Sequence, residues 1–237
     1  MQCICRRSFL AITSGALFAP IAAFAEQKEE VPSVLDHILL GCNDLDRGIA
    51  FVEEHTGVRA AFGGIHPGRG TRNALLSLGD KHYLEIIAPD PQQTSASDFR
   101  NLRDLAEPRL VGWAAHPGEL GAFATRLRNA GVAFEGPTPG SRKRPDGRML
   151  HWKTLNLKDD RGVLPFFIEW SADSVHPSAD APAGCKIVRL EMSGPNAEEL
   201  TRLSKLLELD VRVQKEDKPQ LHARIGGPSG KVMEVTS

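Results

Sequence analysis

The chain has 237 residues with 29 basic and 30 acidic side chains, which gives a formal net charge of −1. That length holds one or two small domains with a hydrophobic core. The near-neutral balance excludes the strongly basic composition of a nucleic-acid-binding protein.

Residues 1–25 have the features of an export signal. Arg6 and Arg7 give a basic start, an uncharged stretch follows, and it ends with Ala23-Phe24-Ala25, the small-x-small pattern that a signal peptidase accepts. A spanning helix needs ~20 strongly apolar residues, whereas glycine, serine and proline dilute this stretch. We therefore expect cleavage rather than an uncleaved anchor, a periplasmic or secreted mature protein, and no stable membrane insertion.

The segment Arg6-Arg7-Ser8-Phe9-Leu10 resembles a twin-arginine signal. The resemblance implies a route that carries proteins already folded, often with a cofactor in place. The alternative is an ordinary signal whose basic end happens to contain two arginines. Without Arg6 and Arg7, 27 of the 29 basic residues remain against 30 acidic ones, so the mature chain carries a net charge of −3.

One order of elements, strand–helix–three strands, occurs three times. Capping residues and glycines mark the helices, as with Asn43 or Asp44 before the first helix and Gly57 after it. The expected first copy has strands near 34–42, 58–62, 73–78 and 83–88, with a helix after 43; the second has strands near 110–115, 132–135, 149–157 and 165–170, with a helix at 118–130; the third has strands near 186–192, 211–214, 220–225 and 231–235, with a helix at 196–207.

A single copy leaves open sheet edges, so the copies are expected to pair. We expect residues 34–180 to form one α+β body, with residues 185–237 as a third, degenerate unit. That unit packs against the first two, or against a second chain in a homodimer. Two cysteines of the mature chain, Cys42 and Cys185, either form a disulfide or stay as separate buried thiols.

Each copy also ends with a glutamate inside an apolar strand. These are Glu85 in Tyr83–Ile87, Glu169 in Phe167–Trp170, and Glu234 near the C-terminus. Three such glutamates at matching places indicate duplication of one unit.

Together these segments resemble the glyoxalase-like domain family of the vicinal oxygen chelate superfamily. The residues that carry the resemblance are Leu35-Asp36-His37-Ile38, the run His66 to Leu75, Tyr83-Leu84-Glu85, the run Ser141 to Arg148, Trp152, and the run Pro165 to Trp170. The resemblance implies a cupped mixed sheet around a cavity, built from the first two units.

The resemblance also implies a divalent metal, Zn, Ni, Mn or Fe, held by the first and last strands of the paired units. His37, Glu85 and Glu169 match these positions, and their donor atoms suit such ions. The fourth position holds Trp113 instead of a histidine. A water takes this place, His66 turns in from its loop, or no metal binds. In glyoxalase I a glutamate is the general base, which implies Glu169 or Glu85 here.

Two glycine-rich, basic segments are candidate anion clamps. The first, Gly63 to Asn73, offers His66, Arg69, Thr71, Arg72 and Asn73; the second, Gly140 to Arg148, offers Arg142 and Arg144. Alternatively, each is only a turn between strands. Trp113 and Trp152 are expected to form walls of the same cleft.

The resemblance favours a metal-dependent lyase or isomerase that acts on a carboxylated or vicinally oxygenated small molecule. The second hypothesis is a non-catalytic protein that sequesters a small, possibly anionic ligand, like the bleomycin-resistance proteins. The third is an extradiol-type iron dioxygenase, which would need two histidines and one glutamate.

Overall fold

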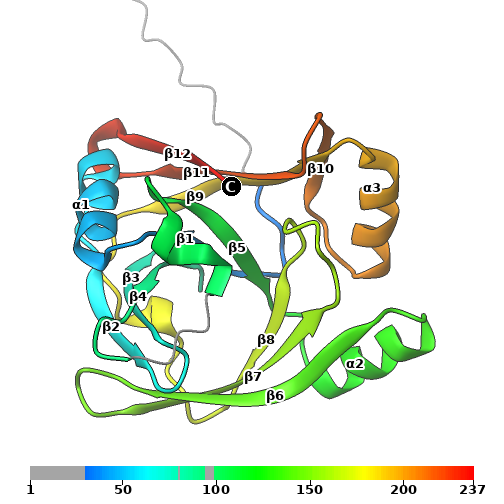
Figure 1. The fold of residues 1–237 in the computed structure, drawn as a ribbon, viewed down its shortest axis with the longest axis horizontal. Helices are drawn as coiled ribbons and strands as arrows, with labels where there is room; N and C mark the ends of the chain where they lie inside the picture. The colour runs from blue at the N-terminus through cyan, green and yellow to red at the C-terminus, as the bar shows by residue number, and fades with distance from the viewer. Residues whose placement is uncertain (1–29, 80, 94–98) are drawn as a thin grey trace, which may run out of the picture.

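The computed structural model describes residues 30–79, 81–93 and 99–237, which form three α-helices and twelve strands (Figure 1). The first unit contains β1 (Leu35–Gly41), α1 (Leu45–Thr56), β2 (Ala61–His66), β3 (Thr71–Ser77) and β4 (Tyr83–Pro89). The second contains β5 (Arg109–Ala115), α2 (Leu120–Asn129), β6 (Phe134–Lys143), β7 (Met149–Leu157) and β8 (Phe166–Trp170). The third contains β9 (Lys186–Gly194), α3 (Ala197–Leu206), β10 (Arg212–Lys215), β11 (Gln220–Gly226) and β12 (Val232–Thr236).

The first two units share one eight-stranded sheet with the order β2-β3-β4-β1-β5-β8-β7-β6. In each unit the first strand runs parallel to the last, β1 beside β4 and β5 beside β8. The units join where β1 and β5 pair antiparallel. This mixed sheet confirms the predicted α+β fold class and the pairing of two equal units.

The sheet curls into a cup whose two edges, β2 and β6, approach each other. Arg142 on β6 donates a hydrogen bond to the carbonyl of Gly63 on β2. The next residue, Gly64, has a φ of 144°, and a Cβ there would lie 2.8 Å from the Arg142 guanidinium. Glycine is therefore required where the arginine crosses the seam of the cup.

Helix α1 covers the outer face of the first half, as its sequence signals predict. The Asp44 side chain accepts a hydrogen bond from the backbone N–H of Arg47 at 2.9 Å, and Gly57 ends the helix in a left-handed conformation with φ 80°. Ile49 and Val52 lie on its buried face. The buried core therefore lies outside the cup, while the inner face lines a cavity.

The third unit repeats the order of elements but not their pairing. Its sheet has the order β10-β9-β11-β12, so the first strand β9 is interior, whereas β1 and β5 stand at the edges of their units. The difference arises because β9 pairs in parallel with β10, the strand directly after the helix. The apolar face of this sheet, which includes Ile187, Leu221 and Met233, joins the main core, and its strands contact α1 and β5 (Figure 1).

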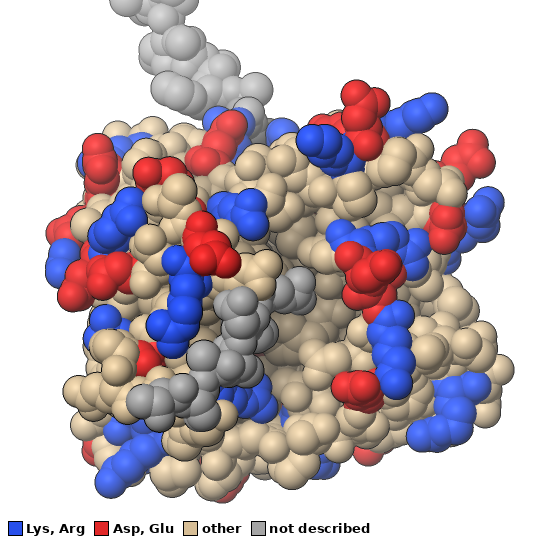
Figure 2. Space-filling model, viewed as in Figure 1, with Lys and Arg blue, Asp and Glu red and all other residues tan. Residues whose placement is uncertain are grey.

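Three further features of the described residues bear on the predictions. Cys42 and Cys185 are both buried and unbonded. None of the described helices is long and apolar enough to cross a membrane. On the face drawn in Figure 2, basic and acidic side chains alternate, with no broad patch of one sign. The predicted signal at residues 1–25 lies outside the described residues.

Candidate functional site

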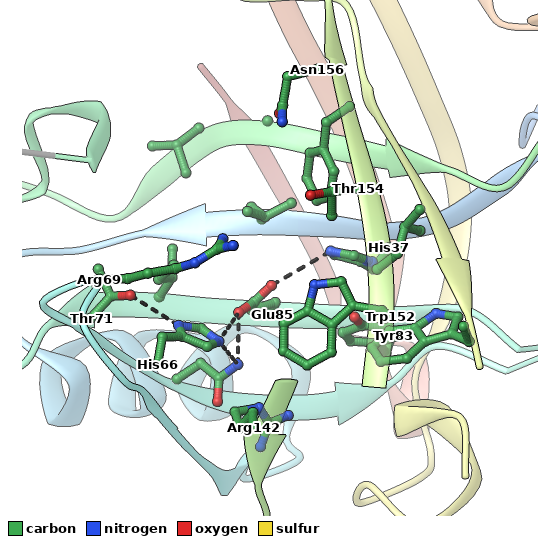
Figure 3. A pocket seen from close by; sticks show the side chains of 18 of the residues that line it. His37, His66, Arg69, Thr71, Tyr83, Glu85, Arg142, Trp152, Thr154 and Asn156 are labelled. Carbon is green, nitrogen blue, oxygen red and sulfur yellow. Dashed lines mark hydrogen bonds and ion pairs between the residues drawn. The ribbon is translucent and has the colours of Figure 1, made fainter. Parts of the chain in front are cut away.

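A cavity of about 400 Å³ occupies the inside of the cup (Figure 3). This volume lies in the range typical of small-molecule sites. Apolar side chains form much of its wall, among them Leu39, Ile87, Val111, Phe166 and Ile168. Most of its ionisable groups belong to the first unit, whereas Arg142 lies on β6 of the second.

Glu85 lies at the centre of this polar group. Strand β4 alternates, so Tyr83, Glu85 and Ile87 face the cavity while the residues between them face the core. The Glu85 side chain is 10 % exposed, and its Oε2 lies 3.5 Å from Nε2 of His37 on β1. Its Oε1 accepts a hydrogen bond of 2.7 Å from the Asn73 amide.

His66 approaches Glu85 from the other side. Its Nε2 lies 3.7 Å from Glu85 Oε1 and 3.4 Å from the Asn73 amide nitrogen. An amide nitrogen can only donate, so this geometry requires an unprotonated Nε2 and places the proton on Nδ1. Nδ1 then donates to the Thr71 hydroxyl at 2.9 Å.

The electrostatics agree with that assignment. Burial lowers the pKa of His66, aided by Arg142 and Arg69 and opposed by Glu85, so the imidazole is neutral near pH 7. Burial alone would raise the pKa of Glu85, but the imidazoles, the Asn73 amide and Arg142 outweigh it, and the pKa lies below its usual value. Glu85 is therefore an ionised carboxylate in a nearly dry site.

Asp36 orients His37, a role that sequence analysis did not assign. The carboxylate is 4 % exposed and lies 2.6 Å from His37 Nδ1, which leaves Nε2 directed at Glu85. Its other oxygen accepts a hydrogen bond from Trp170 Nε1 at 3.0 Å and lies 3.3 Å from His176 Nε2. Burial raises the pKa of Asp36, but the bonds from His176 and His37 dominate and lower it strongly.

Two arginines bring positive charge to the cavity. Arg142 is 4 % exposed at the seam of the cup, and burial lowers the pKa of its guanidinium while Glu85 opposes that shift. Arg69, from the turn between β2 and β3, also lines the cavity and extends into it in Figure 3. An anion placed near them would face two guanidinium groups.

Comparison with known proteins places this geometry in a family. Residues 35–207 match the model of the glyoxalase-like domain. The chain belongs to the glyoxalase-like domain family. That match confirms the resemblance found in the sequence and covers both halves of the cup.

Solved structures share the fold at low sequence identity. A hypothetical protein from Staphylococcus aureus is 18 % identical, with a TM-score of 0.60 over 85 % of this chain and 84 % of that chain. Methylmalonyl-CoA epimerase from Mycobacterium tuberculosis is 24 % identical, with a TM-score of 0.43 over 63 % of this chain and 94 % of that chain. No curated protein matches the sequence.

The glyoxalase-like cavity brings together most of the residues that the sequence singled out. His37, Glu85, His66, Arg69, Thr71, Asn73, Arg142 and Trp152 all line it. Much of the two basic segments is strand rather than loop. His66 ends β2, Thr71 begins β3, and Arg142 lies within β6, whereas residues 144–148 form the turn after β6. Strand alternation therefore decides which of their side chains face inward.

Glu169 does not face the glyoxalase-like cavity, and its prediction as a metal ligand there is wrong. On β8 the residues at 166, 168 and 170 face inward, so Glu169 faces the opposite side. Its Oε2 accepts a hydrogen bond from the backbone N–H of Leu120, the first residue of α2, and Lys153 lies 3.5 Å from Oε1. The carboxylate caps a helix instead.

Trp113, Arg72 and Arg144 are also misplaced by the sequence predictions. Trp113 is fully buried in the core, where its Nε1 donates to the carbonyl of Val163 at 2.8 Å. Register shifts between β1 and β5, one after Leu35 and one after Leu39, place Ala114 rather than Trp113 opposite His37. Arg72 does not line the cavity, since it alternates with the inward Thr71 and Asn73. Arg144 pairs with Asp180 at 2.6 Å, outside the cavity wall.

The metal that the family implies fits these residues poorly. Among the described residues, no group of three or more histidine, cysteine, aspartate or glutamate side chains is arranged to hold an ion. The described cavity wall contributed by β5 to β8 contains none of these residue types. In the first unit, the Asn73 amide already donates a hydrogen bond to one carboxylate oxygen of Glu85. We therefore derive no step through a metal.

One cavity residue, Tyr83, was given no role in the sequence analysis. Tyr83 stacks on His37 with ring centroids 4.4 Å apart. Trp170 lines the wall beside Trp152. The pattern Leu35-Asp36-His37 did offer a clue, because a charged residue inside an apolar strand needs a partner.

Proposed function

We propose that this glyoxalase-like protein is an exported enzyme of the lyase or isomerase class that moves a proton on an oxygenated carboxylic acid. The observation that carries the proposal is Glu85, an ionised carboxylate held between two imidazoles and facing the cavity inside the cup. A fixed carboxylate in such a place is suited to proton transfer at a bound substrate.

Substrate binding would also prepare Glu85 for this role. In the free protein the positive charge of Arg142 helps to keep the pKa of Glu85 low, which makes the carboxylate a weak base. A substrate anion near Arg142 and Arg69 would neutralise that charge and add a negative one. Both effects raise the pKa of Glu85, so its basicity increases only when substrate is present.

The neighbouring imidazoles complete the arrangement. Neutral His66 and Asp36-oriented His37 both direct Nε2 toward Glu85. Each ring can accept the proton that Glu85 gains, or return it to a second atom of the substrate. Proton transfer between two substrate atoms is the step that an isomerase or lyase needs.

Exchange of substrate hydrogen with solvent tests the proposal. Lactate, tartrate and D-gluconate are incubated with the protein in D₂O, and loss of the C2 proton signal is followed by NMR. We expect exchange with at least one acid, its loss in Glu85→Gln, and normal exchange in Glu169→Gln. Binding of an acid without any exchange would favour the sequestration protein instead.

A metal-dependent enzyme is the second candidate, and one observation favours it. His37, His66 and Glu85 are two imidazoles and one carboxylate, donor types that divalent ions accept, although the structure does not arrange these side chains to hold an ion. Calorimetric titration with Zn²⁺ and Fe²⁺ tests this independently of activity. Binding of one ion that disappears in Glu85→Gln would support it.

Export belongs to the same proposal and rests on the sequence alone. Replacing Arg6 and Arg7 by lysine should abolish export if the signal is of the twin-arginine type. An unchanged periplasmic yield would leave only simple secretion.

A further inference from the structure

The second-unit wall of the cavity differs from the first in having unused hydrogen-bonding groups. Strand β7 directs Trp152, Thr154 and Asn156 into the cavity, two residues apart (Figure 3). At about 3.4 Å per residue they form a ladder roughly 14 Å long. Thr138 on β6, which also lines the cavity, pairs directly with Thr154.

The polar atoms of this ladder lack partners within the described part of the chain. The Trp152 indole nitrogen, the Thr154 hydroxyl and the Asn156 amide form no hydrogen bond with any described residue. By contrast, the other two indole N–H groups are bonded: Trp113 donates to Val163 at 2.8 Å and Trp170 donates to Asp36 at 3.0 Å.

These polar atoms face the open space of the cavity: Thr154 is 8 % exposed, Trp152 is half-buried and Asn156 is exposed. Ligand hydroxyl groups can therefore replace solvent as their hydrogen-bond partners. The position of Trp152 depends on Gly140, since a Cβ there would lie 2.5 Å from the Trp152 indole nitrogen. The glycine allows the indole to lie against β6.

The charged groups of the cavity lie apart from the ladder. His66 and Arg142 lie on the two strands that meet at the seam, Arg69 lies in the turn after His66, and Glu85 lies on β4. The ladder itself is neutral. The aromatic rings of Trp152 and Trp170, with centroids 5.6 Å apart, add an apolar wall beside the ladder. A ligand that complements both regions has a carboxylate at one end, near the positive charges, and several neutral oxygens along the rest.

We propose that the substrate is a polyhydroxylated carboxylic acid of about the size of a hexose acid, with hydroxyl groups bonded to Trp152 and Thr154. This assignment rests on the proposed function and specifies its substrate class. The cavity of about 400 Å³ accommodates such a molecule, and the rings face its C–H bonds. Apolar acids of equal size are rejected because they leave the ladder unpaired.

Isothermal titration of the full mature chain with defined probes tests this assignment. D-Glucuronate and D-gluconate represent the hydroxylated acids; hexanoate and 3-phenylpropionate represent apolar acids of similar size. We expect the tighter of the two sugar acids to bind at least tenfold more strongly than either apolar acid.

Two variants locate the contacts. Thr154→Val removes one donor with little change in shape, and Trp152→Phe removes the indole N–H together with part of the ring. Each should weaken sugar-acid binding at least about three- to tenfold, as expected for one hydrogen bond. Binding of hexanoate should not weaken. The matched control is Thr236→Val, an exposed strand threonine of the other sheet, which should bind as the parent protein does. Melting temperatures establish that each variant is folded.

Each outcome of these titrations either supports or overturns the proposed substrate class. Equal or tighter binding of the apolar acids, or unchanged sugar-acid binding in both ladder variants, would overturn the substrate class while leaving proton transfer by Glu85 intact. Absence of binding by all four acids would overturn it as well. Tight, ladder-dependent binding of a sugar acid without C2 exchange would uphold the substrate class and reject the enzyme.

Discussion

The two halves of the cup have the same strand order but supply different chemistry. In the first half, His37, His66 and Glu85 place ionisable groups around one point. In the second half, Ala114 stands opposite His37, and Glu169 faces away from the cavity. Duplicated units thus retain the apolar face that builds the core, while the phase of strand alternation decides which polar residues reach the ligand.

Glu85 and Glu169 give the largest expected contrast between the halves. Glu85→Gln should slow proton exchange by about 10²- to 10⁴-fold, the usual effect of losing a general base. Glu169→Gln should leave the rate within about twofold, because its carboxylate bonds to the start of α2. Initial exchange rates measured by NMR compare the variants, and equal rates for both would remove the distinction.

Replacing Asp36 tests how much this buried carboxylate stabilises the first half of the cup. Asp36→Ala removes a carboxylate that contacts His37, Trp170 and His176, so we expect the free energy of unfolding to fall by about 3 kcal/mol. Chemical denaturation measures the loss. Asp217→Ala, at an exposed position, is the control and should change stability by less than about 0.5 kcal/mol.

Replacing Arg142 and Arg144 separately compares an arginine that lines the cavity with a half-buried one outside it. Arg142→Met should lower the free energy of unfolding by about 2 kcal/mol, since it leaves the buried Gly63 carbonyl unpaired. It should also weaken binding of D-glucuronate. Arg144→Met should cost about 0.5 kcal/mol, because its partner Asp180 is partly exposed. Loss of binding in the Arg144 variant alone would reverse our assignment.

The dependence of the free energy of unfolding on acidic pH should show a smaller effect. The pKa values of Asp36 and Glu85 are lowered from ordinary values of 3.8 and 4.5, so both stabilise the fold above those values. This contribution is lost as the pH falls through the lowered, folded-state values. The parent protein should therefore lose stability below about pH 4.5, and Glu85→Gln should lose less over the same range. Urea denaturation at several pH values compares them.

The sequence predictions were most accurate for features that a single residue can identify, such as a helix end or a polar side chain in a buried strand. Asp44 and Gly57 fixed the ends of α1, and the apolar runs located the strands. His37 and Glu85 were found because polar residues in buried strands require partners. Arg142 was found as a basic residue near a glycine, although its segment proved to be strand rather than loop.

The errors share one physical cause. A shift of one residue turns a strand side chain to the opposite face, and bulges introduce such shifts without a clear sequence signal. Register shifts between β1 and β5 therefore place Ala114 opposite His37, and the phase of β8 turns Glu169 outward. The sequence also did not predict the order of strands in the third unit, where β9 is an interior strand.

The sequence by itself determined the repeated unit, the pairing of two units and the residue types of the polar site, because hydrophobic periodicity and capping are local properties. Only the tertiary structure decided which polar side chains meet. The contacts of Asp36 with Trp170 and His176, and the crossing of Arg142 to Gly63, join residues distant in the chain. These meetings depend on sheet register and on closure of the cup, which no local pattern encodes.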